Sequence, residues 1–222
     1  MAELTDAAAA PMRRLLYGDL PIEDWPEDDG GSSGEAWAEP WSLFARARAH
    51  LRDGDQDLAI RTWSQVANPI FGWESRHVLQ AWHLLRAQGI VPDASIAHEV
   101  LGVVAEVALD GGHGVLAAYA DGSVRFLHHL GGGSIFEPPT PEAVAGAAEG
   151  WLAVAASAVE QVEPWTGDGS QPAGPGETRF VLLTRGGHRA VVGDDATMAT
   201  SPIASSLLGA GAGLLQAVVG AR

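Results

Sequence analysis

A predicted β-hairpin is the feature that most constrains what this chain folds into. The stretch "LAAYADGSVRFLHH" (residues 116–129) places two apolar runs on either side of Asp121 and Gly122. Asp-Gly between apolar runs is a strong signal for a two-residue hairpin turn. Such a turn pairs Tyr119 with Val124. Because side chains alternate along a strand, the two adjacent histidines at the end of the stretch point to opposite faces and do not share a metal ion.

The rest of the C-terminal half follows the same kind of pattern, with apolar residues at every second position from Leu101 onward. Strands are predicted over residues 101–109, 115–120, 123–130, 178–184 and 188–192, with a short edge strand in "GGGSIFEPP", and helices over residues 141–162 and 202–219. This order, β-β-β-β-α-β-β-α, predicts an α+β fold with an antiparallel sheet of about five to six strands and two C-terminal helices. The layout resembles that of profilin-like and roadblock-like domains.

Residues 41–88, which precede the sheet, show helical periodicity and a turn at Gly54. Ala47, Gly54, Ala59 and Trp63 stand where a tetratricopeptide repeat has a small residue, a turn glycine, a close-packing alanine and an aromatic residue. Residues 40–69 therefore resemble a single tetratricopeptide-type helical hairpin. The resemblance implies a helical element that contacts other proteins.

The predicted domain organisation is a flexible, acidic, tryptophan-containing tail over residues 1–38 and a single α+β domain over residues 39–222. Within that domain, residues 39–99 are expected to form a helical cover and residues 100–222 the sheet with its helices. The tail is rich in Pro, Gly, Asp and Glu, which is typical of solvated segments. Alternatively, its tryptophans dock into a partner protein or pack back onto the body of the chain. The candidate docking residues are Trp25, Trp37 and Trp41.

Charge and composition exclude several functions. The formal net charge is −15, and nucleic acids and anionic membranes both require a basic surface. The chain contains no lysine, which excludes lysine Schiff bases and P-loop lysines. It contains no cysteine, which excludes disulfides and thiolate metal sites. We expect neither a nucleic-acid partner nor a membrane partner.

The apolar segments predict a cytoplasmic location. The first apolar run, residues 7–10, is too short for a signal peptide. Residues 201–221 are uncharged over a membrane-spanning length, but their Pro, Ser, Gln and Gly residues favour a buried or interface helix. Gly209, Gly211 and Gly213 in this helix are expected to form a flat strip for a neighbouring backbone. Abundant Ala, Gly and Arg without Lys indicate a GC-rich genome, and we expect a bacterial protein.

Glu106, Arg125 and His129 are the candidate catalytic residues. A five-residue loop over residues 110–114 would put all three on one face of the sheet, with Glu106 level with Arg125. A shorter loop would bury Glu106 among aromatic residues without a partner, which is unfavourable. The three residues would form either an acid–base cluster or a cross-strand ion pair beside a packed histidine.

Sequence motifs for cofactors and metals are lacking. The glycine runs do not have the spacing of a P-loop or a dinucleotide-binding turn, and the Glu74/His77 pair in "ESRH" has no second copy as di-iron proteins require. We therefore expect no cofactor and no metal.

The leading hypothesis is a non-enzymatic protein-interaction or assembly module, such as an adaptor or scaffold subunit. It would dock through the acidic tail, the helical surface or both, onto a protein with a basic surface or onto itself. The alternative is a small-ligand-binding protein or enzyme that uses Glu106, Arg125 and His129, with His113 as a further candidate.

Overall fold

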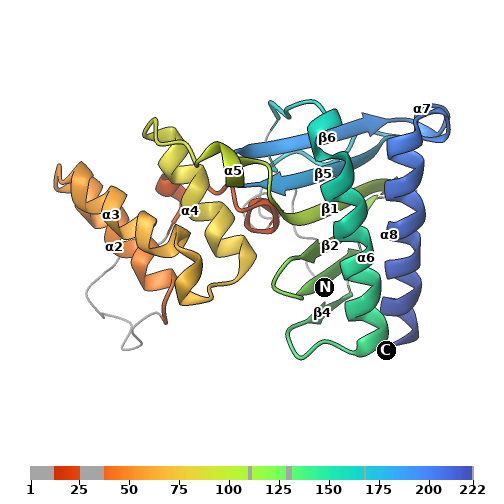
Figure 1. Cartoon of the computed structure of the whole chain (residues 1–222), viewed down its shortest axis with the longest axis horizontal. Coiled ribbons are helices and arrows are strands. Elements are labelled where there is room, and N and C mark those ends of the chain that lie inside the picture. Colours follow the sequence, from red (N-terminus) through yellow and green to blue (C-terminus); the bar gives the residue numbers. More distant parts are fainter. Residues whose placement is uncertain (1–12, 26–37, 110–111, 129–131, 168, 222) are drawn as a thin grey trace. The chain divides into compact units, whose positions relative to one another are not determined.

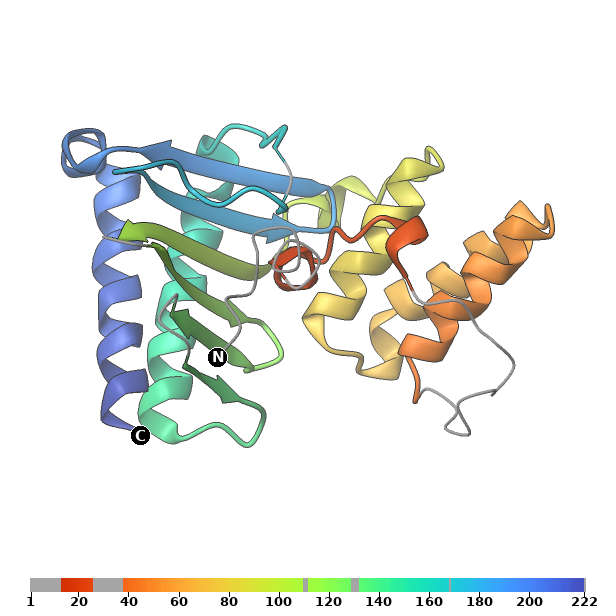
Figure 2. The same ribbon diagram turned by 180° about the vertical axis from the view of Figure 1, so that it is seen from behind.

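The computed structural model of the chain describes residues 13–25, 38–109, 112–128, 132–167 and 169–221 (Figures 1 and 2). The chain divides into two compact units, residues 1–93 and residues 94–222. This boundary differs from the predicted one after residue 38, because the helices before Asp93 group with the N-terminal segment. The predicted covering of the sheet by these helices stays a prediction.

Successive α-helices form much of the described part of the first unit. These are α2 (Trp41–Arg52), α3 (Gln56–Ala67) and α4 (Ser75–Ala87), with the short 3₁₀ turn η2 (Pro69–Phe71) between α3 and α4. Gly54 makes the turn between α2 and α3 with a φ of +86°, a conformation that favours glycine. Ala47, Ala59 and Trp63 are fully buried. Three of the four positions that carry the tetratricopeptide resemblance thus lie in the core of this unit, and the fourth, Gly54, lies in the exposed turn.

The segment over residues 13–25 also belongs to the first unit. The backbone N–H of Leu20 donates to the Gln80 side chain at 2.9 Å, and the Gln80 amide donates back to the Leu20 carbonyl oxygen at 2.8 Å. Gly18 has a φ of +64°, and a Cβ atom there would lie 2.7 Å from Cβ of Leu79. The segment therefore lies directly on α4.

The three candidate docking tryptophans do not all lie in the described part of the chain. Trp25, which follows η1 (Ile22–Asp24), is 2% exposed and stacks on Phe44 with ring centroids 4.4 Å apart. Trp41 is half-buried against the same core, 5.2 Å from Trp25. Both therefore pack back onto the chain, which was the third of the predicted alternatives. Trp37 lies outside the described residues.

The second unit is a six-stranded antiparallel sheet with helices, which confirms the predicted α+β class. The strands are β1 (Val100–Leu109), β2 (Gly112–Tyr119), β3 (Val124–His128), β4 (Gly133–Phe136), β5 (Thr178–Thr184) and β6 (Gly187–Gly193). Their order in the sheet is β4-β3-β2-β1-β5-β6. The first four strands form a meander, and the β5–β6 hairpin adds to the other side of β1 (Figure 1). The likeness to profilin-like and roadblock-like domains remains one of layout.

The helices of this unit are α5 (Ala94–Ala97), α6 (Glu142–Ala158), the 3₁₀ turn η3 (Val159–Gln161), α7 (Asp195–Thr200) and α8 (Pro202–Gly220). The sequence pattern missed α7, whose N-terminus is capped by Asp194: the carboxylate accepts from the Thr197 backbone N–H at 2.9 Å.

The main core lies between the sheet and the α6–α8 pair, which lie side by side over one face (Figures 1 and 2). The predicted apolar stripe of α6 faces this core; its buried residues are Val144, Ala148, Trp151, Ala155 and Ala158. From the sheet, Leu116, Ala118 and Phe180 face it. Ala118 is fully buried in this core.

The hairpin turn between β2 and β3 is one residue longer than predicted. The observed pairs are Ala118 with Val124 and Ala117 with Arg125. The backbone N–H of Gly122 donates to the carbonyl oxygen of Tyr119 at 2.9 Å, and Gly122 has a φ of +86°. This is the three-residue loop in which a β-turn is followed by a left-handed glycine. The predicted facing of Tyr119 with Val124 was therefore wrong, and every side chain of β3 changes face.

We expect the substitution Gly122→Ala to destabilise the β2–β3 hairpin by about 1–2 kcal/mol, because a left-handed backbone conformation is unfavourable for a residue with a Cβ atom. Gly122→Asn is the matched control and should cost less, since Asn tolerates this conformation. Hydrogen exchange of peptides that cover β2 and β3 measures the effect. Equal protection in the Ala and Asn variants would contradict the assigned turn.

Candidate functional site

Glu106 is a buried carboxylate in the middle of the sheet. It lies on the central strand β1, is 0% exposed, and pairs directly with Arg179 of β5. Oε2 of Glu106 lies 3.6 Å from Nη1 of Arg179. The same oxygen accepts a hydrogen bond from the backbone N–H of Ala173 at 3.0 Å. The carboxylate is thus held by a charge and by the loop that precedes β5.

Arg179 extends this network along the loop over residues 164–177. Its guanidinium donates to the carbonyl oxygens of Gln171 and Pro172, at 3.0 and 3.1 Å. It also lies 3.3 Å from a carboxylate oxygen of Glu177 and 5.4 Å from the ring centroid of Trp165. A guanidinium with five fixed donors suits this task, since it binds several oxygens at once.

His113, the further candidate, helps to hold the same loop. Its Nε2 lies 2.8 Å from the carbonyl oxygen of Ala173. Glu106 and His113 thus bind the two sides of one peptide residue, the N–H and the C=O of Ala173. This geometry satisfies the polar backbone groups of a loop that lies on the sheet.

The predicted β1–β2 register was wrong. The predicted five-residue loop would pair Glu106 with Ala118, but Glu106 pairs with Val115, and Leu109 pairs with Gly112. Glu106 therefore lies on the face that was rejected because it offered no partner. The partner comes from β5, whose place beside β1 the local pattern did not predict.

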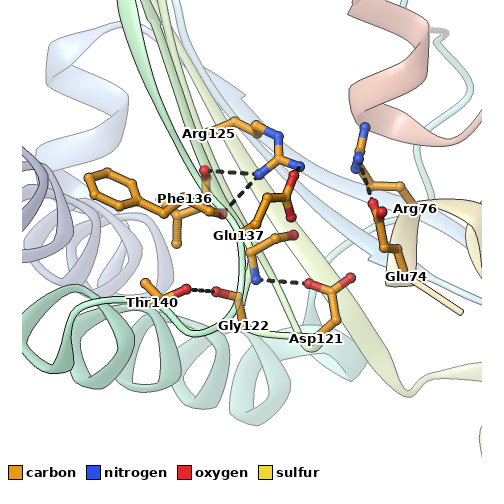
Figure 3. Close-up of polar contacts among 10 residues, drawn as sticks. Glu74, Arg76, Asp121, Gly122, Arg125, Phe136, Glu137 and Thr140 are labelled. Atoms are coloured by element: carbon orange, nitrogen blue, oxygen red, sulfur yellow. Dashed lines mark hydrogen bonds and ion pairs between the residues drawn. The ribbon is translucent and has the colours of Figure 1, made fainter. Parts of the chain in front are cut away.

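Arg125, the second candidate, forms a separate ion pair. It is 5% exposed, and its guanidinium contacts the carboxylate of Glu137, just after β4 (Figure 3). It also donates to the carbonyl oxygens of Phe136 and Val124, at 3.0 and 3.1 Å. These contacts hold the chain that follows the edge strand.

The predicted site is therefore divided among structural pairs. Glu106 and Arg125 lie on the same face of the sheet, as predicted, but each has its own partner of opposite charge. His129 lies outside the described residues. An acid–base mechanism requires groups placed to exchange protons with a substrate. The contacts of Glu106 and Arg125 instead match ion pairs that hold loops in place.

A cleft of about 400 Å³ lies between α5 and the end of α6 with η3. His98, Glu99 and Glu160 line it. His98 lies 3.8 Å from a carboxylate oxygen of Glu160, and Glu99 pairs with Arg185. Burial lowers the pKa of Arg185. Sequence reasoning did not find this cluster, because its residues come from segments up to 90 positions apart and none of them belongs to a motif.

The folded chain lowers the pKa of His83, which lies on α4. Burial and the nearby charges of Arg86 and Arg14 lower its pKa from the ordinary value of 6.5 to about 4. Each of these effects disfavours the imidazolium. The imidazole of His83 is therefore neutral in the folded first unit at pH 7.

One flank of α8 is apolar and exposed. Leu208, Ala212, Leu215 and Val219 follow one another at intervals of four, three and four residues, which is the spacing of a coiled-coil seam. All four are exposed, and Leu208 is 46% exposed. We call these four residues the α8 seam. None of the 19 residues of α8 is charged.

The glycines of α8 do not form the single strip that was predicted. A Cβ atom at Gly211 would lie 3.3 Å from the ring of Trp151, so this glycine lets α6 and α8 approach closely. A Cβ atom at Gly209 or Gly213 would meet nothing within 4 Å among the described residues. These two glycines lie on the exposed side, next to the α8 seam. In the described part of the chain, α8 is also the one helix long and apolar enough to cross a membrane by length and composition.

No protein family, curated protein or solved structure matches the chain. The functional argument therefore depends on the residues and geometry described above.

We expect Glu106→Gln to destabilise the second unit by about 3 kcal/mol, because it removes the fully buried carboxylate from Arg179 and leaves only the more exposed Glu177 beside this guanidinium. Glu137→Gln is the matched control: Glu137 is half-exposed, and its ion pair should contribute about 1 kcal/mol or less. Hydrogen exchange of β1 and β5 measures both effects. A Glu106→Gln variant as protected as Glu137→Gln would contradict a structural role for Glu106.

The stability of the first unit should fall as the pH decreases from about 6.5 to about 4. In this range the unfolded state binds a proton at His83 and the folded state does not, so folding is penalised by about 2 kcal/mol at pH 4.5. His83→Gln should remove this part of the pH dependence. Urea unfolding followed by tryptophan fluorescence reports the first unit, which holds six of the eight tryptophans. If the wild-type chain and the His83→Gln variant lose the same free energy of unfolding over this pH range, His83 is not the cause of the loss.

Proposed function

We propose that this chain is a non-enzymatic protein-interaction module, an adaptor or assembly subunit that docks through its helical surface. The observation that carries the proposal is the exposed, uncharged α8 seam. A soluble surface rarely leaves a regular row of large apolar side chains uncovered unless another molecule covers it. The alternation of four- and three-residue intervals is the pattern by which one helix packs against another in a coiled coil.

The arrangement of the charged candidates supports the same proposal. Glu106, Arg179 and His113 bind the loop over residues 164–177, and Arg125 binds the segment after β4. The hydrogen bonds of these side chains hold backbone segments of the fold in place. This weighs against the alternative of an enzyme or ligand-binding site built on Glu106, Arg125 and His129.

We place the docking surface on the helices rather than on the tryptophans. Trp25 is part of the core of the first unit and Trp41 packs against it. Trp37 remains a candidate for docking. The excess of acidic residues favours either a partner with a basic surface or self-association at a place without charge. A cytoplasmic, bacterial setting belongs to this proposal.

A photo-cross-linking amino acid in place of Leu208 tests the proposal in the organism that makes the protein. We expect a discrete adduct with a polypeptide, because the α8 seam is the docking surface. The same amino acid in place of Leu58 is the matched control, since Leu58 is a helical leucine of similar exposure, 40% against 46%. No polypeptide adduct at position 208, or equal adducts at both positions, would refute the proposed function.

A further inference from the structure

The exposed side of α8 carries both projections and notches. Leu208, Leu215 and Val219 project from it, and Gly209 and Gly213 leave two notches beside them. A two-fold symmetric interface requires projections and notches on the same patch, because each copy supplies both. The projecting side chains of one α8 can therefore enter the notches of another.

The two glycines have no structural explanation within the described part of the chain. Neither has a positive φ, and neither has a neighbour close to the position of a Cβ atom. Glycine inside a helix is unfavourable compared with almost any other residue. A backbone that approaches from outside the chain explains why both positions lack a side chain.

The distribution of charge over the chain also indicates the kind of partner. The chain has 28 acidic and 13 basic residues, so two copies repel each other over most of their surface. In α8 this repulsion is absent, since the helix has no charged residue. A basic partner would gain nothing from a seam without carboxylates. From these observations we propose that the α8 seam binds the α8 seam of a second copy of this chain, which rests on the proposed function and names its partner.

The size of the contact sets its strength. A helix of 19 residues is about 28 Å long and presents a strip about 10 Å wide. The contact thus buries about 300 Å² on each copy, less than the about 800 Å² per partner of a standard specific interface. The dimer is therefore a reversible one, with a dissociation constant in the micromolar range.

Sedimentation velocity of the full chain tests the inference between about 1 and about 200 µM, which brackets a micromolar dissociation constant. We expect a concentration-dependent shift from monomer to dimer. Leu208→Glu should weaken dimerisation at least about tenfold, since it places a carboxylate of each copy in an apolar contact. Leu58→Glu is the matched control and should dimerise like the wild-type chain. A monomer at every concentration, or equal dimerisation of the two variants, would overturn the inference.

Gly209→Leu separates dimerisation from folding. The new side chain fills a notch, so dimerisation should weaken at least about tenfold. Thermal stability measured on dilute monomer should not fall, because the chain leaves this position open and leucine favours a helix. An unchanged dimer in this variant would show that the notches are not used.

Cysteine cross-linking locates the contact. The natural chain has no cysteine, so a covalent dimer of Ala212→Cys reports position 212 alone. Ala212 lies close to the middle of the α8 seam, so it comes near its counterpart in a parallel pair and in an antiparallel pair. We expect rapid disulfide formation under mild oxidation, and its loss when Leu208→Glu is added. A disulfide rate equal to that of Leu58→Cys would overturn the inference.

Other occupants of the α8 seam give different results. A chain that is monomeric at all concentrations, but whose photo-cross-linker at position 208 captures another polypeptide, would overturn the second copy as partner and leave the proposed function intact. Binding of the monomer to phosphatidylcholine vesicles, abolished by Leu208→Glu, would assign the seam to a lipid surface and overturn both.

Discussion

The buried pair of Glu106 and Arg179 is the interaction on which the rest of the second unit depends. It joins the β1–β4 meander to the β5–β6 hairpin, because the two residues face each other across the β1–β5 boundary. A slip of one residue would move one charge to the apolar face beneath α6 and α8, where it would have no partner. The same two side chains bind the loop over residues 164–177, so one network sets strand register and loop position together.

The two faces of the sheet consequently have different characters. One face is apolar and is covered by α6 and α8, with Trp151 packed against Gly211. The other carries the buried charges, each with an opposite charge or backbone carbonyls as partners. A charge so engaged stabilises the fold and is poorly placed to act on a substrate. The outer side of α8 is an exposed apolar surface without such an internal role in the described part of the second unit, and our functional proposals therefore concentrate there.

Sequence patterns predicted much of this architecture and little of its register. The predicted bounds of β5 and the apolar stripe of α6 match the structure, because regular periodicity reports which face of an element is buried. The β2–β3 turn was wrong by one residue, since Asp-Gly occurs both in two-residue turns and at the end of three-residue loops. The face of Glu106 was wrong because Arg179 lies 73 positions away, and local spacing contains no information on that neighbour.

By itself, the sequence determined the class of fold, the order of its elements and the absence of lysine and cysteine chemistry. These properties depend on composition and on periodicities of two and 3.6 residues, which are local. Only the tertiary structure decided that Trp25 is a core residue, that Glu106 pairs with Arg179, and that Gly211 points inward while Gly209 and Gly213 point outward. Each of these depends on contacts between residues far apart along the chain, and a pattern of neighbours in sequence does not specify which distant segment comes to lie alongside.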